Sequence, residues 1–237
     1  MNDLSPMNDA VASAYGMTRY LYVDIETIPV QDEAIAAGIR AGVKPPGGMK
    51  KAETIALWEA NDRPEAEAEA VGKTGLDGAY GHVCTIAWAI NDGHVTLAHA
   101  RSVEDERRVL SEFFAAINPY KTHVIVGHNI AGFDLPFLRK RAVILGVDLP
   151  GPQHLPRDPK AWDKNINDTM VMFAGSRDFI GLDRLCQVLG VPGKGGMDGS
   201  HVASMWAEGR HDEIAAYCAK DVERTRAVHQ RFLAVGW

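Results

Sequence analysis

An apolar run that ends in two acids constrains this chain more than any other feature. Residues 20–29 read Tyr-Leu-Tyr-Val-Asp-Ile-Glu-Thr-Ile-Pro, which is typical of a buried β-strand. Because side chains alternate between the faces of a strand, Asp24 and Glu26 point the same way, roughly 7 Å apart along the backbone. Val23 and Ile25 point to the opposite face. Two acids on one face indicate either a solvated strand end or a site for a divalent cation.

The composition predicts one domain without a membrane anchor. The chain has 237 residues, of which 46% are hydrophobic, so it can bury one substantial core. We expect a mobile leader over residues 1–18 and a single domain over residues 19–237. The sequence has no signal-peptide pattern, and no run approaches the roughly 18 apolar residues that a membrane span requires. These features predict a soluble, cytoplasmic protein that binds no membrane.

The cysteines and histidines give no recognisable metal or disulfide pattern. Three cysteines lie far apart and form no Cys-x-x-Cys pair: Cys84, Cys186 and Cys218. Their spacing argues against a disulfide framework and a zinc ribbon, and favours a reducing compartment. A zinc site built from Cys84 with His82, His123 or His128 lacks ligand spacing, so we interpret these residues as structural.

The net charge limits the kinds of nucleic-acid binding that are plausible. A formal charge of -6 at pH 7 argues against a protein that coats nucleic acid through a large basic surface. It does not exclude a nuclease, because bound cations would reverse the local field that a phosphate meets at an acidic site.

Residues 30–81 form a long insertion after the first strand. Three segments have helical composition, at 31–41, 53–60 and 65–71, and a Lys-Pro-Pro-Gly-Gly break follows the first of them at 44–48. We expect a helical insertion packed on the side of the domain, and a substrate clamp is the alternative.

The next segments predict the opening of a mixed α/β sheet. Residues 83–91 and 94–100 flank an Asp-Gly pair and are typical of a β-hairpin that pairs with the first strand. Ser102 is then expected to cap a helix with an apolar stripe that ends near Asn118-Pro119. A short apolar strand follows at 123–126.

A turn and a helix follow that strand, over residues 127–138. Asp134 lies near the helix start and Pro136 in its first turn, where its missing N–H costs little. By itself, Asp134 fits a helix cap as well as a ligand. The basic cluster of residues 139–141 fits a solvated face, with phosphate contact as the alternative.

The C-terminal third contains a second unusual acid. Asp168 fits a cap or turn before a short apolar segment, and residues 181–189 are helical. A glycine-rich loop around Lys194 lacks the spacing of a phosphate-binding loop. The last helix, at about 212–233, turns Asp221 toward its apolar face, where an acid is costly unless it is paired or bound to metal.

Three short motifs occur in order along the chain: Asp-x-Glu at 24–26, Asn-x-x-x-Phe-Asp at 129–134 and Tyr-x-x-x-Asp at 217–221. Together they resemble the exonuclease motifs of the DEDD superfamily, in its tyrosine-containing DEDDy branch. Their wording (Asp-Ile-Glu-Thr, Gly-His-Asn-Ile-Ala-Gly-Phe-Asp-Leu-Pro-Phe-Leu and Tyr-Cys-Ala-Lys-Asp) is similar to the 3′–5′ proofreading exonuclease domain of family B DNA polymerases. Each motif alone is weak, but three in order make a specific signal.

The resemblance spans about residues 19–233 and implies a ribonuclease H-like α/β fold. Such a fold has a mixed central sheet with an antiparallel second strand, flanking helices and acids gathered at one end. The chain departs from the family pattern through its insertion at about 30–81 and because no polymerase domain follows Trp237. We therefore expect a free-standing polymerase-B-like exonuclease.

The chemistry of the acids supports this interpretation. Four carboxylates can hold two Mg²⁺ or Mn²⁺ ions roughly 4 Å apart: those of Asp24, Glu26, Asp134 and Asp221. Two such ions can activate a water and neutralise the departing 3′ oxygen, and all-oxygen ligation argues against zinc. Tyr217, with a free pKa near ~10, is a poor general base, so we expect it to orient that water.

The resemblance also implies substrate contacts. Thr27 and Ile28 are expected to contact the terminal nucleotide, and Asn129 and Phe133 to help hold the strand. Aromatic stacking suits a sequence-tolerant grip on single strands. For Lys194, a phosphate contact and a solvated loop lysine both stay open.

The leading hypothesis is a metal-dependent 3′–5′ exonuclease that shortens single-stranded or frayed DNA and releases nucleoside 5′-monophosphates. An exoribonuclease of the same fold is an alternative, because the motifs do not distinguish ribose from deoxyribose. A non-catalytic nucleic-acid-binding module would not need four acids and a tyrosine. The expected partner is a single-stranded 3′ end, with DNA favoured over RNA, and the sequence identifies no protein partner.

Overall fold

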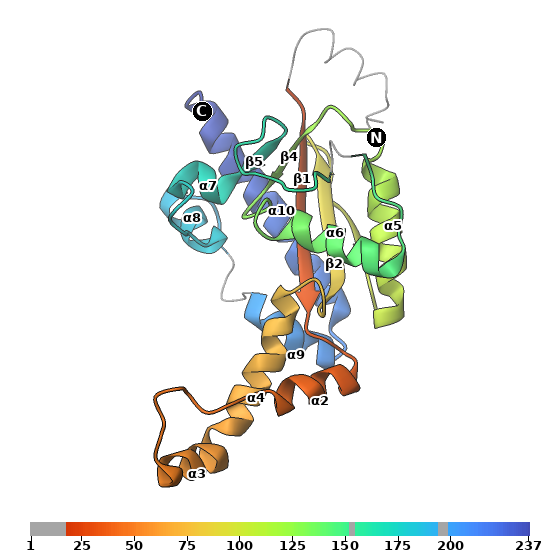
Figure 1. Cartoon of the computed structure of the whole chain (residues 1–237). Coiled ribbons are helices and arrows are strands. Elements are labelled where there is room, and N and C mark those ends of the chain that lie inside the picture. The colour runs from red at the N-terminus through yellow and green to blue at the C-terminus, as the bar shows by residue number, and fades with distance from the viewer. Residues whose placement is uncertain (1–17, 152–154, 194–198) are drawn as a thin grey trace.

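A five-stranded mixed sheet forms the centre of the molecule (Figure 1). The computed structural model describes residues 18–151, 155–193 and 199–237, so the predicted leader lies outside them except for Thr18. The strand order is β3-β2-β1-β4-β5, with β1 at Tyr20–Ile28, β2 at His82–Ile90, β3 at Thr96–His99, β4 at Val124–Gly127 and β5 at Ile166–Asp168. β1 pairs antiparallel with β2 and parallel with β4, which confirms the predicted sheet.

Helices and short 3₁₀ turns connect and cover these strands. They are α2 (Glu33–Ala41), α3 (Ala52–Asn61), α4 (Arg63–Gly72), η1 (Lys73–Leu76), η2 (Val103–Asp105), α5 (Glu106–Ile117), α6 (Asp134–Leu145), α7 (Thr169–Ala174), α8 (Leu182–Leu189), η3 (Gly199–His201), α9 (Val202–Ala207) and α10 (His211–Ala234). The predicted hairpin, helical insertion and long last helix are therefore confirmed. Within the described part of the chain, no helix is both long and apolar enough to cross a membrane.

The two faces of the sheet bury separate clusters. α5 and α6 cover the face to which Val23 points, and α10 covers the face to which Tyr22 points. Because side chains alternate along a strand, Asp24 and Glu26 share the face of Tyr22. The acids of β1 therefore point toward α10, the last helix of the chain.

β1 is longer than its parallel neighbour, and this leaves part of its edge unpaired. β4 pairs only with Tyr20–Tyr22, whereas β1 continues to Ile28. On the other edge, the β1–β2 register shifts between Glu26 and Thr27. Such bulges are frequent beside active sites, where they re-aim side chains. The end of β1 that carries the acids is thus irregular on one edge and open on the other.

The insertion extends past the end of the sheet at which β1 stops, with α3 farthest out (Figure 1). We expected a helical insertion packed on the side of the domain, and its helices lie beyond this end of the sheet. Its two ends are tied together, because the Val30 N–H donates to Thr74 Oγ1 at 2.8 Å. The chain returns through Gly81, where a Cβ would lie 2.5 Å from the Thr74 carbonyl oxygen, so only glycine fits.

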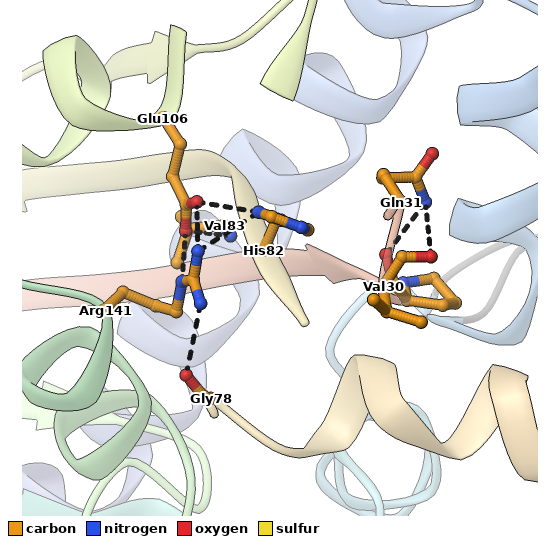
Figure 2. A network of polar contacts seen from close by, with 8 residues as sticks. Val30, Gln31, Gly78, His82, Val83, Glu106 and Arg141 are labelled. Carbon is orange, nitrogen blue, oxygen red and sulfur yellow. Dashed lines mark hydrogen bonds and ion pairs between the residues drawn. The ribbon is translucent and has the colours of Figure 1, made fainter. Parts of the chain in front are cut away.

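A buried ion pair connects α5, α6 and β2 to the end of the insertion (Figure 2). Arg141 Nε and Nη2 donate to the two Glu106 carboxylate oxygens at 2.8 and 2.7 Å, and Nη1 donates to Gly78 O at 3.4 Å. The Val83 N–H and His82 Nδ1 also approach the Glu106 carboxylate, at 2.8 and 2.9 Å. Burial alone would raise the pKa of Glu106, but the hydrogen bonds from His82, Arg141 and Val83 outweigh it and lower the pKa.

Two sequence-based expectations about these elements were wrong. Arg141 was assigned to a solvated basic face, but it is only 3% exposed because it neutralises Glu106. Arg139 and Lys140 do reach outward, to Pro156 O and to the Asp77 carboxylate. Ser102 does not cap α5, because a 3₁₀ turn intervenes and the helix begins at Glu106.

His229 is fully buried on α10, near the start of β1. Its Nε2 lies 2.9 Å from Asn167 Nδ2, and its Nδ1 lies 3.1 Å from Tyr22 Oη. An amide nitrogen can only donate, so Nε2 accepts and Nδ1–H donates to the tyrosine oxygen. Burial lowers the pKa of His229 to about 4, and the imidazole is therefore neutral at physiological pH.

This histidine should make stability depend on pH. In the unfolded chain the pKa of this histidine is near ~6.5, so between pH 6.5 and its folded pKa of about 4 the unfolded state binds more protons than the folded state. The free energy of unfolding therefore includes the full contribution of neutral His229 above about pH 6.5. This contribution should fall by up to about 3 kcal/mol as the pH is lowered toward 4. Urea unfolding at about pH 7.5 and about pH 4.5 measures it. His229→Gln should lose less stability over this range than wild type, and an equal loss in both would contradict the assignment.

Candidate active site

Asp24 and Glu26 lie beside a cysteine of α10. One ligand atom from each of Asp24, Glu26 and Cys218 lies within 4.8 Å of the others. Cys218 Sγ donates to the backbone oxygen and to Oδ2 of Asp24, both at 3.4 Å. Burial, followed by the negative charges of the two acids, raises the pKa of Cys218, so the thiol stays protonated. It therefore orients Asp24 as a donor and is a poor metal ligand.

Asp134 reaches these acids because β4 ends early. It is the first residue of α6, 4% exposed, and its Oδ1 accepts the Ile25 N–H at 3.2 Å. Ile25 lies on the part of β1 that has no β4 partner, so the carboxylate takes the place of a neighbouring strand. The alternative role as a helix cap does not apply, because Phe133 is the cap residue and Asp134 bonds to β1.

The surroundings of Asp134 disfavour the ionised form of its carboxyl group. Burial raises the pKa of Asp134 well above its usual value, and the nearby carboxylate of Asp24 raises it further. Two acids this close in a buried site cannot both ionise easily unless a cation compensates them. Carboxylate oxygens are also the ligands that Mg²⁺ and Mn²⁺ prefer, so the residues present fit a divalent cation.

α10 brings Tyr217 and Asp221 to the same place. The two side chains are 5% and 3% exposed, and they lie one helical turn apart. Burial raises the pKa of Tyr217, and the charges of Asp221, Glu26 and Asp24 raise it further, as does its hydrogen bond with Asp221. The phenol therefore stays protonated and can act as a hydrogen-bond donor but not as a base.

Asp168 organises the loop that leads into Asp134. Its carboxylate accepts the Asn129 N–H at 2.9 Å, the Ala131 N–H at 3.2 Å and the Met170 N–H at 3.1 Å. The predicted cap is confirmed, since Asp168 is the N-cap of α7. The bonds to the distant loop were missed, because a cap pattern says nothing about which remote N–H groups the same carboxylate binds.

The backbone of this loop is sharply turned at Asn129, where φ is 60°, a left-handed value that Asn tolerates better than most residues. A Cβ at Gly132 would lie 2.5 Å from Asn129 Oδ1, so a larger residue there would displace the Asn129 side chain. His128 ties the loop to Thr169 Oγ1 at 3.0 Å and to Ile180 O at 2.8 Å. These bonds agree with the structural role expected for His128.

A pocket of about 540 Å³ opens beside the acids. Glu26, Thr27 and Phe133 line one part of it, and Leu76 of η1 and Ala203 of α9 line another. The insertion therefore contributes a wall of the pocket. Thr27 Oγ1 donates to Gly75 O at 2.7 Å, which holds this wall against β1.

Two expected substrate contacts do not line this pocket. Ile28 is 1% exposed and packs against Met205 and Ile214, so its side chain is not available to a nucleotide. Asn129 lies in the loop before α6, half-buried and outside the pocket lining. Lys194 lies outside the described residues.

Residues 76–236 match a family model described as a predicted 3′–5′ exonuclease related to the exonuclease domain of PolB. The chain belongs to this family. The match includes Asp134, Tyr217 and Asp221, whereas Asp24 and Glu26 precede it. Exonuclease domains of this polymerase-B-like kind use divalent metals, and the acids described above fit that use.

Similar proteins include archaeal DNA polymerases. One from Pyrococcus glycovorans is 32% identical over 91 residues, which are 35% of this chain and 12% of the polymerase. One from Archaeoglobus fulgidus is 50% identical over 38 residues, 16% of this chain and 5% of the polymerase. The chain thus matches only a small part of each.

A solved structure shows the same fold. The family B DNA polymerase from the hyperthermophilic archaeon Pyrobaculum calidifontis aligns with a TM-score of 0.57 and 21% identity. The alignment covers 91% of this chain and 24% of the polymerase chain. The predicted ribonuclease H-like α/β fold is confirmed by this likeness and by the mixed sheet.

The role of Asp168 can be tested by removing one acceptor. Asp168→Asn keeps the shape but turns an NH₂ group toward a backbone N–H, and a buried unpaired donor costs about 1–3 kcal/mol. Urea unfolding should show a loss of this size. Asp32→Asn is the matched control, because Asp32 caps α2 at an exposed position where Asn caps equally well. Losses of equal size in the two variants would contradict the role of burial.

Proposed function

We propose that this chain is a metal-dependent 3′–5′ exonuclease acting on single-stranded or frayed DNA ends and releasing nucleoside 5′-monophosphates. The observation that carries the proposal is the convergence of acids from β1, α6 and α10. Asp134 lies close enough to Asp24 for that charge to raise its pKa, and Asp221, Glu26 and Asp24 all act on Tyr217. Glu26 also lines the pocket. Membership of the polymerase-B-like exonuclease family supports the same activity.

In this proposal two divalent cations, Mg²⁺ or Mn²⁺, are held by four carboxylates: Asp24, Glu26, Asp134 and Asp221. When bound, such ions supply an activated water and a counter-charge for the departing 3′ oxygen. The protein contributes a set of fixed oxygen donors, because Cys218 orients Asp24 and β1 anchors Asp134. Their burial keeps bulk water from screening these charges.

Tyr217 and the pocket have proposed roles in positioning the reactants. The protonated phenol of Tyr217 hydrogen-bonds to Asp221, and its oxygen can accept a hydrogen bond that orients a water near Asp221. The pocket has the size of a small-molecule site and would receive the terminal nucleotide, with Phe133 stacking on its base. Thr27 and the backbone of Ile28 would lie beside it, and Asn129 would help to hold the strand that follows.

The central prediction concerns the metal ligands. Asp24→Asn or Asp221→Asn should lower the rate by roughly 100-fold or more, because even the loss of a group that only supports a metal ligand costs about 10–100-fold. The measurement is a time course on 5′-labelled single-stranded DNA with Mg²⁺, Mn²⁺ or EDTA. The wild-type protein should shorten the labelled strand from its 3′ end with either metal, and digestion should stop in EDTA.

The control is Asp92→Asn, in the turn between β2 and β3 beside the start of β1, which should keep wild-type activity. Full activity in both site variants would refute the proposal. A matched RNA oligonucleotide tests the sugar preference. If RNA is digested faster than DNA, the proposed substrate becomes RNA, and the proposed metal chemistry is unchanged.

The pocket makes a separate prediction. Phe133→Leu keeps an apolar side chain but removes the ring, and stacking is worth about 1–3 kcal/mol per base. KM for the oligonucleotide should rise by about fivefold or more, with a smaller change in kcat. Phe137→Leu is the control, because its ring lies 5.5 Å from that of Phe133 but is buried away from the pocket. An unchanged KM for Phe133→Leu would exclude the stacking role.

A further inference from the structure

Arg224 holds one of the proposed metal ligands. It lies one helical turn after Asp221 on α10, and its Nη1 is 2.6 Å from Asp221 Oδ1. Its Nη2 donates to Gly193 O at 3.0 Å, and its side chain is only 12% exposed. Asp221 is thus contacted from one turn before by Tyr217 and from one turn after by Arg224.

The guanidinium of Arg224 is held through two of its nitrogens. A planar fork that uses two nitrogens for two different acceptors has little freedom to rotate. Its second acceptor, Gly193 O, lies beside the first turn of α8, because a Cβ on Gly193 would lie 2.7 Å from Asp183 Oδ1. Arg224 therefore sets the direction of the Asp221 carboxylate as well as balancing its charge.

We propose that Arg224 is a positioning residue of the metal site. By binding Asp221 Oδ1 it limits the directions in which this carboxylate can meet a divalent cation, and it couples the carboxylate to the backbone at Gly193. The inference rests on the proposed function, since it assumes that Asp221 is a ligand. Groups that orient a ligand in this way typically contribute 10–100-fold to metal affinity.

A simple counter-charge would behave in the opposite way. Removing a positive charge next to a cation site makes the site more negative, and on electrostatic grounds alone this tightens binding of a divalent cation. Loss of orientation instead weakens binding, because the carboxylate rotates among several directions. The sign of the change in affinity therefore separates the two roles.

The experiment titrates Mn²⁺ alone into the metal-free full chain and measures the free ion by electron paramagnetic resonance. Arg224→Met should bind Mn²⁺ roughly 10- to 100-fold more weakly than wild type. Arg224→Lys restores the charge but not the fork, so it should remain much weaker than wild type. Melting curves check that each variant is folded, and the lysine variant carries the test if the methionine variant is not.

Arg226→Met is the matched control. It removes the same charge from the same helix, but Arg226 Nη1 donates to Gly93 O at 2.7 Å and Asn91 O at 3.3 Å, in the β2–β3 turn. Its Mn²⁺ affinity should stay within about twofold of wild type, because a screened charge at a distance has little effect.

The outcomes separate the inference from the proposed function. Unchanged or tighter binding in Arg224→Met, full recovery in Arg224→Lys, or equal weakening in Arg226→Met would each overturn the positioning role while leaving the nuclease intact. If wild type itself bound no Mn²⁺, the metal site would fail, and the role of Arg224 would fail with it.

Discussion

The hydrogen bond from the Ile25 N–H to Asp134 is the contact on which the site geometry depends. It exists because β4 stops after pairing with Tyr20–Tyr22, so that β1 runs on with an unpaired edge. An unpaired buried N–H is costly, and here a carboxylate satisfies it. The same bond holds Asp134 in a buried position next to Asp24, where burial and then the charge of Asp24 raise the pKa of Asp134. One hydrogen bond therefore both pairs the buried Ile25 N–H and places Asp134 beside the acids of β1.

Neighbouring groups support this arrangement by restricting how each acid can turn. Cys218 donates to Asp24, Asp168 holds the loop before α6, and Arg224 holds Asp221. None of these groups needs to touch a substrate. Each fixes a carboxylate or a backbone segment, so that the acids are already oriented before anything binds.

Local sequence patterns predicted the elements that carry the site but not their support. The alternation around Asp24 and Glu26 and the helical spacing of Tyr217 and Asp221 are properties of neighbouring residues, and strand and helix periods make them visible. Arg141 could not be placed in this way, because its burial depends on Glu106, which is 35 residues away along the chain. The wall that the insertion gives to the pocket is likewise a contact between segments distant in sequence, and no periodic pattern reports it.

α10 connects the chemistry of the site to the stability of the whole domain. It is a single helix of 24 residues whose first half carries Tyr217 and Asp221 and whose second half buries His229. An uninterrupted helix behaves as a rigid rod, so a shift of one end also moves the residues at the other end. The neutral histidine packed against Tyr20 and Tyr22 at the start of β1 therefore helps to fix where Asp221 meets the acids farther along the same strand. A long last helix packed against β1 is what brings acids from opposite ends of the sequence together.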